Sequence, residues 1–65
     1  MSDWQERVGV EADELEAKIE KLECFLNGQG VEEIDMEVID LLHLQLSAMK
    51  QYNHILSMRI VKFKN

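Results

Sequence analysis

The chain has 65 residues, a net charge of −6 and one cysteine, so it makes at most one small domain and has neither an internal disulfide nor a cysteine-rich zinc site. The negative charge disfavours DNA binding, and the sequence shows neither a signal-peptide pattern nor an apolar run able to cross a membrane. We therefore expect a soluble intracellular chain that compensates for its small core by self-association.

A first helix is predicted over residues 3–26. Ser2 and Gln5 have the spacing of a capping box, which places the helix start at Asp3. Apolar residues then recur at alternating spacings of three and four, so they form one stripe along the helix. The stripe consists of Val8, Ala12, Leu15, Ile19, Leu22 and Leu26. We expect it to be the packing surface of this helix.

A turn is predicted over residues 27–34. Its first four residues are Asn27, Gly28, Gln29 and Gly30, and we expect them to supply the left-handed conformations that end a helix and reverse the chain. Asp35 follows in the position of an N-cap for the next helix. Because the connection is short, the two helices should pack antiparallel.

A second helix is predicted over residues 36–61, and it is apolar on two sides. One face holds Ile39, Leu42, Leu46, Met49, Leu56, Ile60 and Phe63, and the other holds Leu41, Leu44, Ala48, Ile55 and Met58. One partner helix covers only one face, so the second face should meet other chains. The predicted fold is all-α, with one domain over residues 1–65 that forms an antiparallel two-helix hairpin and assembles into a homo-oligomer.

Charge is divided unevenly along the chain. Residues 1–40 hold all 13 acidic residues and three of the seven basic ones, a net charge of −10, whereas residues 41–65 carry a net charge of +4. The simpler interpretation is that two helices of opposite charge attract each other in the hairpin. The other is that the second helix carries an anion-binding strip, and the two are compatible.

Catalytic and metal-binding motifs are absent from the sequence. Cys24 falls near the predicted turn and His54 near the open end of the hairpin, so they do not form a nucleophile and base. His43 and His54 are eleven residues apart and lack the spacing of a helical zinc pair. We therefore expect neither catalysis, nor a metal site, nor a cofactor.

Polar residues follow one line along each predicted helix. Gln45, Tyr52 and Arg59 are seven residues apart, and in an antiparallel hairpin their line passes along Glu11, Arg7 and Trp4. An aromatic ring beside guanidinium groups can stack a base and bind phosphates. The alternative, which the residues alone favour, is a structural network of salt bridges and hydrogen bonds between chains.

Two spaced patterns give the chain a family resemblance. They are W-x-x-R-V-x-x-E-x-x-x-L-x-x-K-I-x-K-L-x-x-F over residues 4–25 and L-L-x-x-Q-L-x-x-M-x-x-Y-x-x-I-L-x-x-R-I over residues 41–60. Together they resemble a family of small phage helical-hairpin proteins related to the hairpin domain of the anti-CBASS and anti-Thoeris signal sponges.

The resemblance implies a phage anti-defence protein that binds cyclic nucleotide immune signals between the protomers of a homo-oligomer, with a hexamer favoured, and does not cleave them. The signal would be a cyclic di- or oligonucleotide or a cyclic ADP-ribose type molecule, bound in the cytoplasm of the infected bacterium. The implied ligand-binding residues are Arg7, Glu11, Lys18, Gln45, Met49, Tyr52 and Arg59. A different function stays open, that of a small oligomeric adaptor or inhibitor binding a host protein through the apolar face of the second helix.

Overall fold

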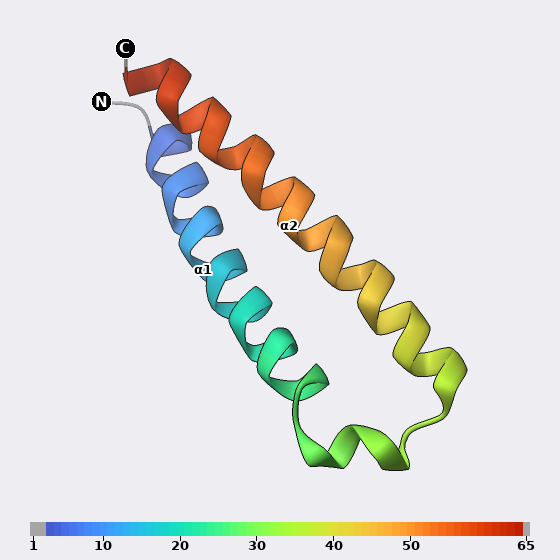
Figure 1. Ribbon diagram of the computed structural model, residues 1–65. Helices are drawn as coiled ribbons and strands as arrows, with labels where there is room; N and C mark the ends of the chain where they lie inside the picture. The colour runs from blue at the N-terminus through green and yellow to red at the C-terminus, as the bar shows by residue number, and fades with distance from the viewer. Residues whose placement is uncertain (1–2, 65) are drawn as a thin grey trace.

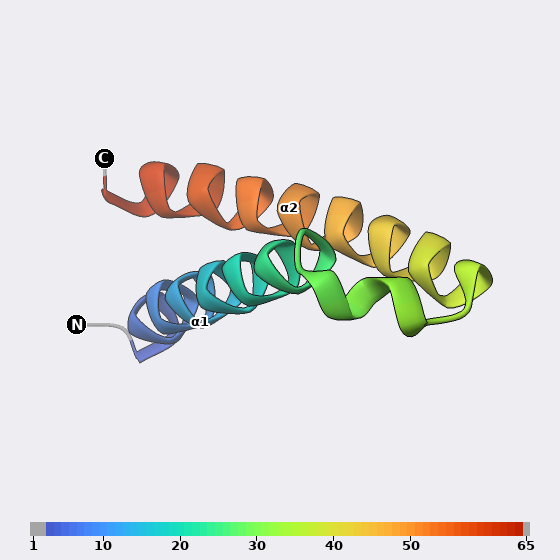
Figure 2. The ribbon, with the colours of Figure 1, turned by 60° about the horizontal axis from the view of Figure 1, so that its bottom comes forward.

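The computed structural model describes residues 3–64, with the backbone alone for Gln29 and Lys64. Two helices, α1 (Asp3–Leu26) and α2 (Met36–Lys64), are joined through a short 3₁₀ helix, η1 (Gln29–Glu33). They run antiparallel, so the start of α1 and the end of α2 lie together and η1 lies at the other end (Figure 1). Figure 2 shows that they also cross at an angle. The predicted all-α two-helix hairpin is confirmed.

The second helix is three residues longer than predicted, ending at Lys64 instead of residue 61. No glycine or proline follows Val61, and Phe63 packs edge-to-face against Trp4 with ring centroids 5.2 Å apart. This aromatic contact with α1 stabilises the last turn of α2. The proposed capping residue Ser2 lies outside the described residues.

The two helices meet along one continuous line of side chains. On α1 the predicted apolar stripe is buried or half-buried throughout, with Val8 and Ile19 most enclosed. The inner seam of α2 consists of Ile39, Leu42, Leu46, Met49, Asn53, Leu56, Ile60 and Phe63. Leu56 is 0% exposed, and full burial of such a side chain stabilises a fold by about 1.5–3 kcal/mol. Both predicted packing faces are confirmed, with Asn53 as an added polar member.

The connection differs from the prediction. No residue within 3–64 has a positive φ, and Gly28 is extended with φ −85° and ψ 170°. Instead, Asn27 N–H donates to the Glu23 carbonyl and Gly28 N–H to that of Phe25, which tightens the last turn of α1 before η1 begins. A Cβ at Gly28 would lie 3.3 Å from the Phe25 carbonyl oxygen, so the glycine allows a close approach to this carbonyl and does not adopt a left-handed conformation.

The predicted N-cap of α2 is confirmed. The backbone N–H of Glu37 donates to Asp35 Oδ1 at 3.1 Å, and that of Ile39 donates to the Asp35 carbonyl at 3.0 Å. The side-chain bond satisfies one of the four amides that have no partner at the start of a helix. Asp35 therefore sets the residue at which α2 begins.

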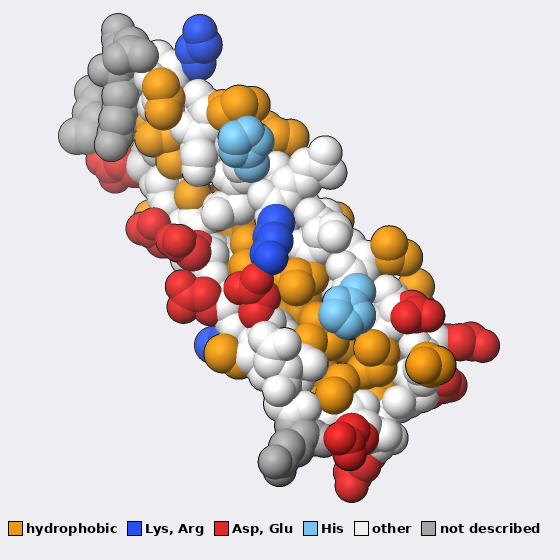
Figure 3. Space-filling model, viewed as in Figure 1, with side chains coloured by type: hydrophobic (Ala, Val, Ile, Leu, Met, Phe, Trp, Pro, Cys, Tyr) orange, Lys and Arg blue, Asp and Glu red, His pale blue; other side chains and the backbone are white. Residues whose placement is uncertain are grey.

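Charge on the surface follows the division in the sequence. Figure 3 shows apolar side chains along the line between the helices and acidic ones along the α1 edge and around the loop. Lys50 Nζ of α2 lies 2.6 Å from Glu23 Oε2 of α1, an exposed ion pair worth at most about 1 kcal/mol. Of the helices in residues 3–64, neither is long and apolar enough to cross a membrane.

Candidate ligand-binding site

Tyr52 and Glu11 form the polar link between the helices toward their open end. The Tyr52 hydroxyl donates a short hydrogen bond to Glu11 Oε2, joining residues 41 positions apart in the chain. This contact lies on the line of polar residues predicted from the sequence. It fixes which side of α2 faces the N-terminal half of α1, and with it the positions of neighbouring side chains.

The hydrogen bond to Glu11 also raises the pKa of the Tyr52 phenol above its usual value of 10.0. Partial desolvation of the phenol and the negative charge of Glu11 act in the same direction, while the positive charge of Arg59 acts against them. Arg59 stands two helical turns beyond Tyr52, so both side chains project from the same side of α2. Three of the predicted residues, Glu11, Tyr52 and Arg59, thus lie along one side of the hairpin toward its open end.

A cationic hollow of about 380 Å³ lies at the open end of the hairpin. Its lining residues are Trp4, Arg59, Lys62 and Phe63. The Trp4 and Phe63 rings meet at 83°, which leaves an aromatic edge beside the two basic side chains. Among residues 3–64, no acidic residue lines this hollow, although the chain as a whole is negative. Aromatic surface beside basic groups is the chemistry that binds a base and its phosphate.

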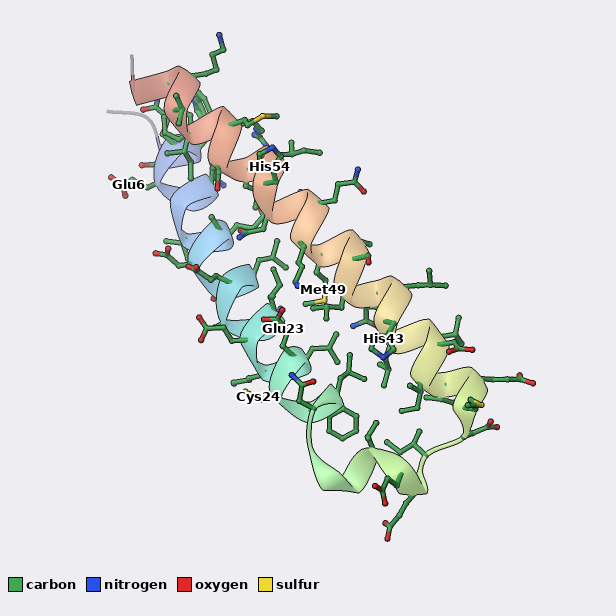
Figure 4. All side chains as sticks on the ribbon, viewed as in Figure 1. Glu6, Glu23, Cys24, His43, Met49 and His54 are labelled. Atoms are coloured by element: carbon green, nitrogen blue, oxygen red, sulfur yellow. The ribbon has the colours of Figure 1, made fainter. Side chains whose placement is uncertain are left out.

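An acidic hollow of about 540 Å³ lies along the first half of α1. It is lined by Asp3, Glu6, Arg7, Val10, Glu11 and Glu14. Four carboxylates surround the single guanidinium of Arg7, so this surface repels phosphate. Figure 4 shows Glu6 on the side of α1 turned away from α2. The structure therefore separates Arg7 from Arg59, which the sequence had placed together.

The remaining predicted residues lie farther along the hairpin. Gln45 Nε2 is 3.8 Å from Met49 Sδ within α2, and Met49 is half-buried on the side that faces α1 (Figure 4). At 1.5 Å per residue, Gln45 lies about 21 Å from Arg59 along the helix. Lys18 is exposed on α1, and within residues 3–64 no hydrogen bond or ion pair joins it to the other six. These three residues do not belong to the open-end site in one chain.

Three residues of the cationic hollow were not among the predicted site residues: Trp4, Lys62 and Phe63. The available signal was the antiparallel pairing itself, since it brings the first turn of α1 beside the last turn of α2. Phe63 had been placed on the inner apolar face of the second helix, although both it and Lys62 lie beyond the predicted helix end at residue 61. The helix continues to Lys64, and this extension places Lys62 and Phe63 in the hollow together with Trp4.

The cysteine and the two histidines do not form one cluster. Figure 4 shows Cys24 on α1 and His43 on α2 in the half of the hairpin near the connection, and His54 toward the open end of α2. Cys24 is exposed. Within residues 3–64, no three His, Cys, Asp or Glu side chains converge in a group able to hold a metal ion.

Fold and site together define a small helical hairpin with a cationic, partly aromatic hollow at its open end. The chain belongs to the Sequestin family, which matches residues 2–62, and the family name is consistent with a sequestering role. Comparison with curated proteins and with solved structures gave no match.

Proposed function

We propose that this chain is a phage anti-defence sponge that sequesters a cyclic nucleotide immune signal without cleaving it, in the cytoplasm of the infected bacterium. Binding alone is sufficient for such a role, because a signal held by the sponge does not reach its effector. Family membership supports sequestration, and the resemblance of the two sequence patterns supports a cyclic di- or oligonucleotide or a cyclic ADP-ribose type ligand. The sponge would act as a homo-oligomer.

The observation that carries the proposal is the composition of the cationic hollow. Arg59 and Lys62 supply two positive charges, and Trp4 supplies a half-exposed aromatic surface beside them. A phosphate would accept hydrogen bonds from Arg59 while a base lies against the indole ring. The acidic hollow on α1 disfavours the same ligand, so binding is directed to one surface of an otherwise negative protein.

Tyr52 and Glu11 would act as positioning residues for this site. Their hydrogen bond keeps Glu11 occupied and holds α1 against α2. Arg59 stands two helical turns beyond Tyr52 on the same side of α2, on the open-end side of this bonded pair. Loss of the Tyr52 hydroxyl would leave Glu11 able to pair with Arg59 and withdraw it from the ligand.

Native mass spectrometry tests the proposal directly. The purified protein is measured alone and with cyclic dinucleotides, cyclic trinucleotides and cyclic ADP-ribose isomers, with inorganic phosphate and linear mononucleotides as comparison ligands. We expect a discrete number of cyclic nucleotide masses per assembly and recovery of the same intact nucleotide after the protein is denatured. A shortened nucleotide would show cleavage, and the absence of bound nucleotide from every mixture would overturn the proposal.

Paired variants locate the site. Arg59→Ala removes a charge-assisted contact worth about 1.5–3 kcal/mol, so the dissociation constant should rise roughly 10- to 100-fold. Lys21→Ala, which removes an exposed cation of α1 outside both hollows, should leave binding unchanged. Equal effects of the two variants would mean that the ligand responds only to net charge. An unaffected Arg59→Ala protein would exclude the cationic hollow.

A further inference from the structure

The face of α2 turned away from α1 carries an ordered line of uncovered side chains. This outer stripe consists of Leu41, Leu44, Ala48, Gln51, Ile55 and Met58, all exposed. Their spacing alternates between three and four residues, the repeat of a helix that packs along a second helix. Leu41 and Leu44 are 64% and 67% exposed, and Met58 is 51% exposed. Apolar side chains in such a row mark an interaction surface.

The area of the chain indicates how large the missing contact is. Its accessible surface is 5290 Å², whereas a compact monomer of 7.6 kDa exposes about 4,300 Å². The excess of about 1,000 Å² reflects the elongated shape of the hairpin, 48 × 15 × 14 Å, and is large enough to include the roughly 800 Å² that each partner buries in a standard protein interface. One hairpin thus leaves uncovered about as much surface as one partner would bury.

We propose that the partner is a second copy of this chain, packed with its α2 antiparallel to the first about a two-fold axis between Ala48 and Gln51. In that arrangement Leu41 faces Met58 of the second copy and Leu44 faces Ile55, while small Ala48 faces Gln51 at the centre. Each pair occurs twice because a two-fold interface uses the same patch on both chains. The stripe is complementary to itself in this direction along its whole length.

Charge at the two ends of the stripe selects the antiparallel direction. Glu37 precedes Leu41 by four residues and Lys62 follows Met58 by four, and both are exposed. Antiparallel packing brings Glu37 of each copy beside Lys62 of the other. Parallel packing would instead place Glu37 against Glu37 and Lys62 against Lys62, with the two helix dipoles aligned. The stripe and its ends therefore favour one orientation.

The pairing needs no ligand and does not depend on the proposed function. Lys62 also lines the cationic hollow, so in the pair Glu37 of the second copy lies at the rim of each hollow, and Arg59 is the cation left free to bind a ligand phosphate there. Because α2 lies between the stripe and the inner seam, the hairpin contact between α1 and α2 is unchanged by the pairing.

Cysteine cross-linking tests the orientation. Exposed Cys24 is first replaced, Cys24→Ala, and Leu41→Cys and Met58→Cys are then made separately in that background. Mixing and oxidising the two proteins should give a mixed disulfide, identified by its mass. The Leu41→Cys protein alone should not cross-link, since its two thiols lie about 25 Å apart in the antiparallel pair, far beyond disulfide reach. Efficient Leu41→Cys homodimers, or no cross-linked product, would overturn the proposal.

Sedimentation of ligand-free protein tests the surface itself. Leu44→Glu should shift the assembly toward the monomer, and Val61→Glu is the matched control because Val61 is 59% exposed but lies off the stripe. Circular dichroism of both variants records whether they remain helical. If Leu44→Glu is not helical, the cross-linking experiment still tests the pairing. A wild-type chain that is monomeric at all concentrations would overturn the proposed pairing. The outer stripe would then be a binding surface for a different protein, and the result would not contradict nucleotide binding.

Discussion

At the scale of single residues, Asn53 is an unusual member of the inner seam. Its Oδ1 atom is buried, and within the described part of the chain it has no hydrogen-bond partner. Its neighbours along the seam are Met49 and Leu56, so the amide interrupts an otherwise apolar line. A buried polar atom without a partner costs about 1–3 kcal/mol, and polar residues at such positions in helical bundles restrict register and partner number.

Asn53→Leu should stabilise the hairpin. The substitution removes the unsatisfied carbonyl and adds apolar surface to the seam, so the free energy of unfolding should rise by about 1–2 kcal/mol. Urea denaturation followed by circular dichroism measures this. Asn53→Asp, of nearly the same size, would bury a charge and should lower the free energy of unfolding. A destabilised Asn53→Leu protein would show that the amide is satisfied in the assembled state.

Tyr52 offers a direct readout of the contact between the helices. It is the only tyrosine, so near-ultraviolet absorbance follows its ionisation alone. Because the bond to Glu11 raises its pKa in the folded chain, the phenol should titrate above its usual value of 10.0. The stability it contributes is present below that value and is lost as the pH rises through the raised pKa.

Glu11→Gln supplies the control for this titration. The neutral amide oxygen is a weaker acceptor for the phenol than the carboxylate and carries no negative charge to oppose phenolate formation, so the pKa of Tyr52 should fall part of the way toward its usual value while the helices stay paired. An unchanged midpoint in Glu11→Gln would show that the phenol is not bonded to Glu11 in solution.

At the scale of the elements, the connection depends on a few local contacts. Gly28 favours the turn because a Cβ there would make tight contacts with the carbonyl oxygens of Phe25 and Cys24, at 3.3 and 3.4 Å. Ile34 N–H closes η1 on the Val31 carbonyl at 3.1 Å, and Asp35 then caps α2. The reversal is thus made of short-range hydrogen bonds, with little apolar burial to support it.

Asp35→Ala should shorten α2 at its start. Loss of the cap leaves the Glu37 amide without its side-chain acceptor and should lower the free energy of unfolding by about 0.5–2 kcal/mol. Asp35→Asn keeps an oxygen acceptor and should remain near wild type. Thermal unfolding of the wild-type, Asp35→Ala and Asp35→Asn proteins measures the difference. An equal loss of stability in the two variants would mean that the negative charge of Asp35, and not its capping hydrogen bond, stabilises the start of α2.

At the scale of the whole molecule, the hairpin is long and thin, with Cα extents of 48 × 15 × 14 Å. In the described residues the buried apolar core consists of Val8, Ile19 and Leu56, of which Leu56 alone is fully buried. A core this small gives a single chain little free energy of folding, because burial must offset the conformational entropy of every ordered residue. Assembly through the outer stripe would supply the remaining burial.

The unfolding temperature should therefore depend on protein concentration. If folding and pairing are linked, dilution favours the unfolded monomer, and a tenfold dilution should lower the midpoint by several degrees. Leu44→Glu should weaken this dependence, while Val61→Glu should retain it. A midpoint that is independent of concentration for the wild-type chain would mean that each hairpin folds by itself.

The sequence by itself determined the two helices, the faces they pack with and the antiparallel hairpin. Apolar residues at spacings of three and four define the packed side of a helix whatever its partner, and a short connection leaves only antiparallel neighbours. The cap at Asp35 was equally local, since it needs only its own side chain and the next two residues. Leu41 and Leu44 likewise belong to the second apolar face predicted from the sequence, and both are exposed in the structure.

Only the tertiary structure decided which polar residues meet. Arg7 and Arg59 share a predicted line but face different hollows, and Asn53 enters the seam where the apolar pattern of α2 skips from Met49 to Leu56. Periodicity gives the direction of a side chain around its own helix. The rotation and register of one helix against the other arise from the packing of both surfaces at once, here through Leu56, the bond from Tyr52 to Glu11 and the contact of Phe63 with Trp4.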